Sequence, residues 1–479
     1  MPSRTRLNET IAAISSLDLA AMAEARAHQD RLTKPRGSLG ALEDVAVRLA
    51  GIAAVSPPPL PEPAALAIFA ADHGVHAQGV SPWPQEVTTQ MVANFLAGGA
   101  VANAFAAQAG ITVTVVDVGV ATDLPPAPNL RVHKAGYGTA DLSQGPAMTE
   151  AQALTALCAG IETATTLIAD GARCLITGDM GIANTTASAA LICAFTGSDP
   201  TDATGRGTGI DDTTLNHKIA IIRQALTKNA IPGAGHASQP PTKNEISDAG
   251  GTSQALATNA GPGIGDSSQA LTEGAVTGAG GTSRALATNA GPGAGDPSQA
   301  LAMNAVSGIG DSSQALAEAA VSGAGDSFQA LAANEVPNVG DSSQALAENA
   351  IPGAGDLSQA LRILAAVGGF EHAAIAGFVL GAAAQRVPVV LDGVIAGAAA
   401  LVAAGLAPEA IGYCVAGHRS AEPGHAIALE FLGLRPLVDL ELRLGEGSGG
   451  LLAQPLIVAA ARVMHDVATF DSAGVSDKT

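Results

Sequence analysis

The sequence predicts an α/β fold in which a parallel sheet is covered by helices. Short apolar runs typical of buried strands alternate along the chain with longer segments of helical spacing. Such alternation favours a sheet that is buried on both faces and binds its ligands at the carboxyl ends of the strands. The runs expected to form strands are residues 64–71, 112–118, 174–177 and 387–391.

Helices are expected near both chain ends and between the strands. The first two flank the turn Lys34-Pro35-Arg36-Gly37, because proline and glycine interrupt a helix. Asp72-His73-Gly74 follows the first strand and delivers polar residues to its carboxyl end. The segments expected to be helical are residues 17–31, 38–52, 81–96, 149–170 and 451–464.

Composition restricts the class of protein. The 479 residues are only 14% charged and 3% aromatic, which favours closely packed helices and tight loops. The net charge is −20 and the sequence pI is about 4.7. Because nucleic acids and anionic membranes would be repelled by such a chain, neither is expected as a partner.

The cysteines and the apolar segments indicate the compartment. Four cysteines lie far apart without metal-ligand spacing, which predicts buried free thiols in a reducing compartment. The segment 7–22 is interrupted by polar residues and forms no signal-peptide core. No apolar stretch reaches the length of a membrane helix, so we expect a soluble cytoplasmic protein.

Between residues 223 and 361 the chain repeats itself every 15 residues. The heptapeptide NAIPGAG of residues 229–235 returns unchanged at 349–355, an offset of 120 residues or eight periods. Removing those 120 residues leaves 359 in register, which predicts a tandem expansion at one permissive surface loop. The little apolar surface of each unit favours disorder or short fluctuating helices, and a solenoid of stacked repeats is the alternative.

The repeats also carry much of the negative charge. Residues 231–350 contain eleven acidic side chains and two basic ones, a net charge of −9. Nearly half of the net acidity of the chain therefore lies in this segment. For that reason the overall charge says little about the substrate of the remaining chain.

Two glycine-rich loops are candidate phosphate sites. Residues 178–186 (GDMGIANTT) follow the third expected strand and open a helix, whose free N–H groups and positive dipole end suit an anion. Residues 204–212 (TGRGTGIDD) precede Lys218, which would complete such a site. The alternatives are close packing of strand against helix for the first loop and a merely exposed lysine for the second.

Near the C-terminal end, residues 442–450 (LRLGEGSGG) place one carboxylate, Glu446, between glycines and before an apolar helical run. An isolated carboxylate held by the backbone suits a general base, whereas a solvated turn is the other interpretation. Asp72, His73 and His76 are weak metal-ligand candidates, since no second ligand cluster accompanies them. No metal site is expected.

Several separated motifs occur in an order that is known from one enzyme family. They are residues 32–40, 71–75, 84–88, 178–186, 368–371, 391–393 and 442–449. With the repeats set aside, the chain resembles the nicotinate-nucleotide:dimethylbenzimidazole phosphoribosyltransferases over residues 10–228 and 356–470. That family makes α-ribazole phosphate for the lower ligand of cobalamin, and it has no counterpart to the repeats.

The resemblance implies an architecture and a reaction. It implies a Rossmann-like α/β domain, a small helical domain built from the two chain ends, and a homodimer with active sites near the subunit interface. The phosphoribosyl group of nicotinate mononucleotide would pass to 5,6-dimethylbenzimidazole with inversion at C1′ and release of nicotinate. Small-molecule substrates are thus the expected partners, with no cofactor. The expected divisions are the N-terminal helical part of the small domain (1–60), the first part of the α/β core (61–228), the repeats (229–355), the second part of the α/β core (356–440), and the catalytic loop with the C-terminal helix (441–479).

The resemblance also implies site residues. Glu446 matches the general base of the family, while the two glycine loops and Lys218 would hold the 5′-phosphate. The region from Ser81 to Met91 would wall the benzimidazole, with Trp83 in the core as the alternative. Asp179 stands where the family often has a glutamate, which is one methylene longer. The residues expected to bind substrate are Ser81, Trp83, Gln90, Met91, Gly178, Asp179, Met180, Gly181, Ile182, Gly207, Gly209, Lys218, Leu444 and Gly445.

Two other functions compete with this one. A diphosphate-using phosphoribosyltransferase needs paired acidic residues after an apolar strand to organise Mg²⁺ and diphosphate, and residues 389–393 supply only Asp392. The other competitor is a scaffold or binding protein whose acidic repeats recruit partners while the catalytic core is a relic.

Overall fold

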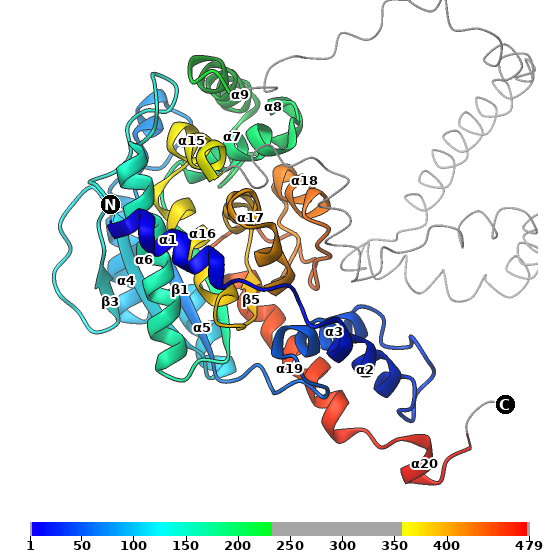
Figure 1. Ribbon diagram of the computed structural model, residues 1–479. Coiled ribbons are helices and arrows are strands. Elements are labelled where there is room, and N and C mark those ends of the chain that lie inside the picture. Colours follow the sequence, from blue (N-terminus) through cyan, green and yellow to red (C-terminus); the bar gives the residue numbers. More distant parts are fainter. Residues whose placement is uncertain (1, 232–356, 477–479) are drawn as a thin grey trace, which may run out of the picture. The chain divides into compact units, whose positions relative to one another are not determined.

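The structure is a computed structural model that describes residues 2–231 and 357–476 (Figure 1). The repeats between residues 232 and 356 lie outside the described residues, so the expectations for them stay predictions. Helices of the first part are α1 (Pro2–Ala13), α2 (Leu19–Gln29), α3 (Ala41–Ala53), the 3-10 helix η1 (Gly74–Gln78), α4 (Val87–Ala97), α5 (Val101–Ala109), α6 (Glu150–Ala169), α7 (Asn184–Thr196), α8 (Pro200–Ala203) and α9 (Asp212–Lys228). Those of the second part are α15 (Leu357–Val367), α16 (Phe370–Ala383), α17 (Val394–Leu406), the 3-10 helix η3 (Pro408–Tyr413), α18 (Pro423–Phe431), α19 (Ser448–Asp466) and α20 (Phe470–Ala473).

Six parallel strands form one sheet in the order β3-β2-β1-β4-β5-β6. At its centre, Ala67 pairs with Thr114 on one side and with Thr177 on the other. This order is that of doubly wound nucleotide-binding sheets, in which a crevice opens where the chain reverses direction, here between β1 and β4. The strands are β1 (Ala64–Ala71), β2 (Thr112–Gly119), β3 (Leu130–Val132), β4 (Cys174–Met180), β5 (Val389–Leu391) and β6 (Cys414–Ala416).

Helices cover both faces of the sheet, as the sequence predicted. Every residue of β1 is buried, and successive side chains enter opposite cores. Phe69 packs in the core beneath α6, α16 and α17, whereas Leu66 and Ile68 pack in the core beneath α4, α5 and α19. Burial on both sides explains why β1 is a continuous apolar run instead of an alternating one.

The helices α6 and α16 pack very closely because small residues lie at their contact. An ideal Cβ atom on Gly160 would lie 1.8 Å from the Ala374 carbonyl oxygen, and one on Gly377 would lie 1.9 Å from that of Leu157. Only glycine fits at these two positions. Within the described ranges, α6 is the one helix with the length and apolar composition of a membrane span, and 56% of its apolar window is buried inside the protein.

Helices from the two ends of the chain form a cluster. Helices α2, α3 and α19 pack against one another (Figure 1). Leu32, just after α2, forms a β-bridge with Thr469, just after α19. Arg48 of α3 is buried and donates to the Ile411 and Cys414 carbonyl oxygens, which joins this cluster to the end of the sheet. The small helical part expected from the chain ends is therefore present.

Some elements differ from the sequence predictions. Strand β4 continues to Met180, so Gly178 and Asp179 belong to the strand and not to the turn that was predicted for them. Pairing with Ile68 and Phe69 of β1 extends the strand that far. The strand expected from residue 387 begins at Val389.

Other elements were not predicted at all. Strands β3 and β6 have three residues each, which is too short for a periodic pattern. Helix α1 is polar along much of its length and is joined to α6 by the ion pairs Arg4–Glu150 and Arg6–Glu162.

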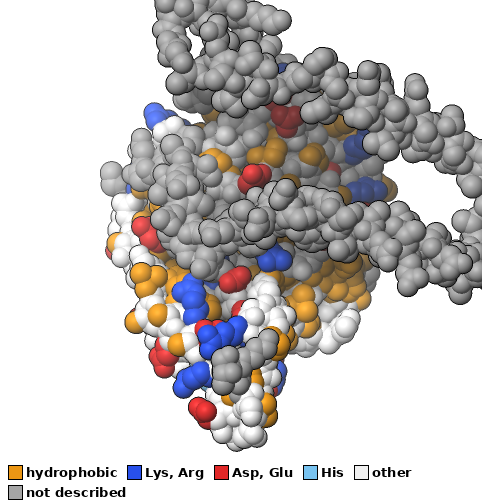
Figure 2. Space-filling view, turned by 90° about the vertical axis from the view of Figure 1, so that its right-hand side faces the viewer, with side chains coloured by type: hydrophobic (Ala, Val, Ile, Leu, Met, Phe, Trp, Pro, Cys, Tyr) orange, Lys and Arg blue, Asp and Glu red, His pale blue; other side chains and the backbone are white. Residues whose placement is uncertain are grey.

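The cysteines and the surface agree with the composition. All four cysteines are free and buried, as predicted. On the surface shown in Figure 2, Lys and Arg side chains of the described residues are interspersed with Asp and Glu.

Candidate functional site

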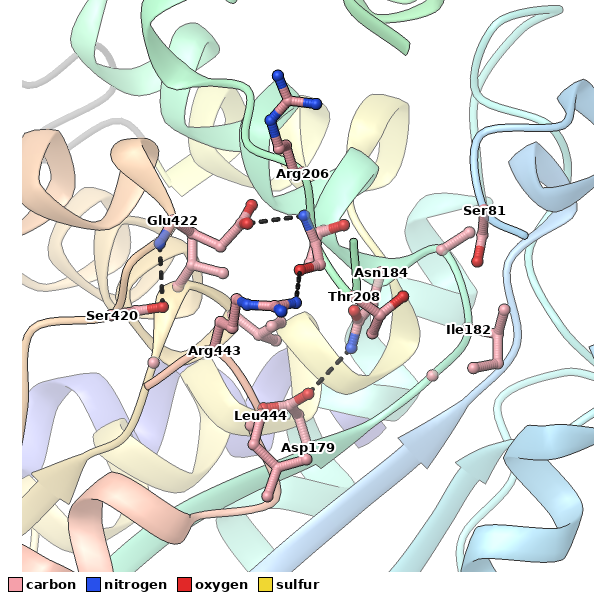
Figure 3. A pocket seen from close by; sticks show the side chains of 18 of the residues that line it. Ser81, Asp179, Ile182, Asn184, Arg206, Thr208, Ser420, Glu422, Arg443 and Leu444 are labelled. Carbon is pink, nitrogen blue, oxygen red and sulfur yellow. Dashed lines mark hydrogen bonds between the residues drawn. The ribbon is translucent and has the colours of Figure 1, made fainter. Parts of the chain in front are cut away.

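A cavity opens at the carboxyl edge of the sheet, where the segments that follow β1, β4, β5 and β6 converge (Figure 3). The loop after β1 contributes Ser81, and the turn after β4 contributes Gly181 and Ile182. This position is the reversal point between β1 and β4, where doubly wound sheets bind ligands.

Lys218 of α9 is the buried cation of this cavity. Lys218 is 1% exposed, and its Nζ donates to Thr185 Oγ1 at 2.8 Å and to the Gly205 carbonyl oxygen at 3.1 Å. Burial lowers the pKa of Lys218 to about 8, although the nearby Glu422 opposes this shift. A buried cation close to the start of α7 suits an anionic group such as a phosphate.

Glu422 and Arg443 hold the second glycine loop in place. The Gly207 N–H donates to Glu422 Oε1 at 2.7 Å, and Arg443 donates to the Gly207 carbonyl oxygen at 3.0 Å (Figure 3). An ideal Cβ atom on Gly205 would lie 2.3 Å from Glu422 Oε2, so a side chain there would displace the Glu422 carboxylate. Both polar groups of Gly207 are therefore fixed by residues more than 200 positions away in the sequence.

Glu446 lies in a strained loop beside the cavity. Its φ angle is 66°, in the left-handed region, and the flanking Gly445 and Gly447 have φ angles of 82° and 88°. The residue is 6% exposed, and its carboxylate accepts from the Ala102 N–H at the start of α5. Oε2 has no hydrogen-bond partner in the part of the chain that the structure describes.

The surroundings of Glu446 make it basic. Burial raises the pKa of Glu446 to about 7; the hydrogen bond from Ala102 opposes this shift, and the negative charge of Asp392 adds to it. A carboxylate with a pKa near neutrality and a free oxygen has the properties of a general base.

Asp392 organises the loop that carries Glu446. It follows β5, and its Oδ2 accepts from the Gly447 N–H at 3.0 Å. Its Oδ1 accepts from the N–H groups of Gly449 and Gly450 at 2.7 and 3.0 Å. These three donors belong to the start of α19, so one fully buried carboxylate caps this helix and fixes the backbone next to Glu446.

Asp179 is a second buried acid at the cavity wall. Its Oδ2 accepts from Asn184 Nδ2 at 3.0 Å, while Oδ1 has no partner among residues 2–231 and 357–476 (Figure 3). An ideal Cβ atom on Gly445 would lie 3.1 Å from Asp179 Oδ2, so Asp179 adjoins the Glu446 loop. Burial, then the charges of Asp392 and Glu371, raise the pKa of Asp179 well above its usual value.

The structure brings most of the predicted site residues together. Those that line the cavity are Ser81, Asp179, Met180, Gly181, Ile182, Gly207, Lys218, Leu444 and Gly445. Gly178 lies behind it, where an ideal Cβ atom would be 2.9 Å from the Glu446 carbonyl oxygen. Gly209 lies near Arg443 and outside the lining.

The predicted benzimidazole wall is placed differently. Trp83, Gln90 and Met91 do not line the cavity. Trp83 is 48% exposed, so it is not a core residue, and its carbonyl oxygen bonds to His76 Nε2 at 2.8 Å. Contact of these three residues with a benzimidazole stays a prediction.

Several cavity residues were missed from the sequence. They are Asn184, Thr185, Arg206, Thr208, His418, Ser420, Glu422 and Arg443. Asn184 and Thr185 lie within the first glycine loop, Arg206 and Thr208 lie within the second, and Arg443 lies within residues 442–450, all of which were singled out. The segment 418–422 follows β6 at the same edge of the sheet, so recognising that three-residue strand would have pointed to it.

The weak metal-ligand candidates Asp72, His73 and His76 form no common ligand group among the described residues. Asp72 Oδ2 accepts from the Ala121 N–H, and His76 bonds to the Trp83 carbonyl oxygen, so neither joins His73. His73 lies instead with Glu371 and His372 of α16, in a cluster whose nitrogen and oxygen atoms are within 4.8 Å of one another.

The parallel sheet with this strand order, the buried lysine and the two glycine turns are features of nucleotide-binding α/β proteins. A family model described as a phosphoribosyltransferase matches residues 14–261 and 293–475. These matches cover most of the chain, which is therefore a phosphoribosyltransferase.

Similar proteins identify the particular family. A nicotinate-nucleotide–dimethylbenzimidazole phosphoribosyltransferase of Salinispora tropica is 45% identical over 98% of this chain and 100% of its own. The protein of the same name from Chloroflexus aurantiacus is 40% identical over 98% of this chain and 99% of its own. A solved structure of this enzyme from Thermus thermophilus has a TM-score of 0.66 at 36% identity and covers 96% of this chain and 100% of its own. The chain belongs to the nicotinate-nucleotide–dimethylbenzimidazole phosphoribosyltransferase family.

Proposed function

We propose that the protein transfers the phosphoribosyl group of nicotinate mononucleotide to 5,6-dimethylbenzimidazole, and that Glu446 is the general base of this reaction. The family membership of the chain supports the reaction, whose products are α-ribazole 5′-phosphate and nicotinate. Two properties of Glu446 support the residue assignment. Its Oε2 atom is buried and has no hydrogen-bond partner among the described residues, and burial raises the pKa of its carboxylate to about 7. The competing scaffold function has no comparable support within the described residues.

The chemistry requires a proton acceptor. The ring nitrogen of nicotinate mononucleotide is a pyridinium, so nicotinate departs with a neutral ring nitrogen. The incoming benzimidazole attacks C1′ with one nitrogen while the other nitrogen still carries a proton. As the new N–C bond forms, that second nitrogen becomes acidic, and Glu446 Oε2 accepts its proton. Attack on the face opposite the leaving group converts the β-linkage into an α-linkage.

The 5′-phosphate would lie between Lys218 and the glycine turns. Nζ of Lys218 and the start of α7 provide positive charge, and Gly181, Ile182 and Gly207 line the same space. The substrate phosphate would raise the pKa of Lys218 and keep the ammonium charged in the complex. Phosphate held here positions the ribose between this end of the cavity and the Glu446 loop.

Further parts of the proposal concern organisation. The divisions 1–60, 61–228, 229–355, 356–440 and 441–479 are supported by the packing of α2, α3 and α19, which come from the two chain ends, against one another. We also infer a homodimer in the cytoplasm, without nucleic-acid or membrane partners. The family resemblance supports the dimer, and the acidic composition supports the exclusion of anionic partners.

Release of nicotinate tests the catalytic assignment. The purified full chain should release nicotinate from nicotinate mononucleotide only when 5,6-dimethylbenzimidazole is present. Glu446→Gln should lower kcat by about 10²- to 10⁴-fold, which is the usual contribution of a general base. Glu441→Gln is the matched control, because Glu441 is exposed in the same segment and also has a positive φ angle. Undiminished release by Glu446→Gln would refute the assignment.

A further inference from the structure

A buried cluster of two histidines and one glutamate lies behind the cavity wall. His73 follows β1, while Glu371 and His372 lie in the first turn of α16, and all three are 0% exposed. His73 Nε2 lies 2.8 Å from Glu371 Oε1, and His372 Nδ1 lies 2.7 Å from the same oxygen in a bent geometry. This cluster takes no part in the mechanism proposed above.

Ser188 links His372 to the start of α7. The Ser188 hydroxyl lies 3.0 Å from the Asn184 carbonyl oxygen, to which it can donate. His372 Nε2 lies 2.8 Å from Ser188 Oγ, and either atom can be the donor of this hydrogen bond. The remaining nitrogen, Nδ1, faces Glu371.

A proton must then lie between Glu371 and His372. A bare Nδ1 lone pair would face a carboxylate oxygen at 2.7 Å, which is repulsive inside a protein. Burial alone would raise the pKa of Glu371, but His73 and His372 outweigh it and lower that pKa. The carboxylate is thus ionised, and a hydrogen on His372 Nδ1 faces it.

His73 completes the cluster as a hydrogen-bond donor. Its Nδ1 has no partner within the described ranges, so a hydrogen placed there would be buried and unsatisfied. The hydrogen belongs on Nε2, where Glu371 accepts it. A metal-binding tautomer of His73 would require the unfavourable arrangement, so the donor set fits a hydrogen-bonded cluster better than a metal site.

From His372 a chain of hydrogen bonds reaches the cavity. Ser188 joins His372 to the backbone of Asn184, and the Asn184 side chain donates to Asp179 Oδ2 at 3.0 Å. These residues lie in the first two turns of α7 and at the end of β4, and each is at most 7% exposed. The chain ends at Asp179 Oδ1, the buried oxygen that remains free beside the Glu446 loop.

We infer that His372 is a positioning residue that holds Asp179 in place beside the Glu446 loop through Ser188 and Asn184. This inference rests on the function proposed above. The charges that face Asp179 are Asp392 after β5, Glu371 on α16 and Glu446 before α19, and all three are acidic. His73 and His372 face Glu371 from the other side and partly offset its charge.

Two substitutions at His372 test this link, with kcat/KM for benzimidazole measured at saturating nucleotide. His372→Asn places its amide near Glu371 and cannot reach Ser188, whereas His372→Gln reaches Ser188. The Asn variant should lose about tenfold in kcat/KM, the value of roughly one hydrogen bond, and the Gln variant should recover most of it.

The outcomes are distinguishable from failure of the proposed function. An active wild type and an inactive Glu446→Gln variant establish the reaction and its base, whatever the cluster does. The inference is overturned if His372→Asn keeps the wild-type kcat/KM, or if His372→Asn and His372→Gln lose activity equally while both unfold at the wild-type temperature. Elemental analysis provides a further test. One equivalent of metal in the wild type that is lost in His372→Asn would show that the cluster holds a metal ion and not a hydrogen bond.

Discussion

The acid limb of the pH–rate profile is the most direct consequence of the environment of Glu446. Because burial raises the pKa of Glu446 to about 7, the carboxylate is half ionised at that pH. One pH unit lower, only about one tenth of it is ionised, so kcat/KM for benzimidazole should be about a tenth of its plateau. An unperturbed glutamate would instead place this limb near pH 4.3. Nicotinate release at saturating nucleotide, measured between pH 5 and 9, gives the profile.

A second substitution identifies the group that produces the limb. Asp392→Asn removes a negative charge that raises the pKa of Glu446, so the acid limb should move to lower pH. The amide oxygen can still accept from Gly449 and Gly450, although the hydrogen bond from Gly447 is lost if the amide NH₂ faces it. Asp439→Asn, on a half-exposed residue paired with Arg419, is the control. A wild-type limb below pH 6, or one that Asp392→Asn leaves in place, would refute this account of Glu446.

Three further predictions concern phosphate binding, packing and the repeats. Lys218→Met should raise KM for nicotinate mononucleotide by roughly 10- to 100-fold with a smaller change in kcat, because a charge-assisted hydrogen bond is lost; an unchanged KM would place the phosphate elsewhere. Gly377→Ala should lower the free energy of unfolding by about 3 kcal/mol, since its Cβ atom would meet the Leu157 carbonyl oxygen at 1.9 Å. Gly145→Ala, which has open space, is the control in urea denaturation, and equal stability of the two variants would contradict the packing argument. Deletion of residues 231–350 should leave kcat/KM unchanged because it rejoins identical heptapeptides, and loss of solubility would indicate a structural role for the repeats.

Local sequence was sufficient for the central elements of the fold. Strand β1 was predicted with its observed bounds because a run of eight buried apolar residues between prolines and polar residues has few other conformations. β2 and β4 were found for the same reason. The three-residue strands β3 and β6 were not found, since pairing with a neighbouring strand, and no local pattern, makes them extended.

The residues of the candidate site also fall into those that local sequence reveals and those that only the tertiary structure reveals. The glycine loops and Glu446 stand out because their residue types and spacing are unusual by themselves. The segment 418–422 does not, because its importance arises from its place at the sheet edge next to β5. The predicted turn at Gly178 and Asp179 was wrong for a related reason, as pairing with β1 keeps both residues in the strand.

The sequence by itself determined the class of fold, the family, the glycine loops and the identity of the acid that would accept a proton. Only the tertiary structure decided which groups surround that acid. Asp392 binds the N–H groups of Gly447, Gly449 and Gly450 from more than 50 residues away, and Glu422 binds Gly207 from 215 residues away. Such contacts depend on which strand ends lie side by side, and the resulting burial gives Glu446 its raised pKa. Sequence spacing carries no information on either, because a hydrogen bond requires only that its two partners meet in space.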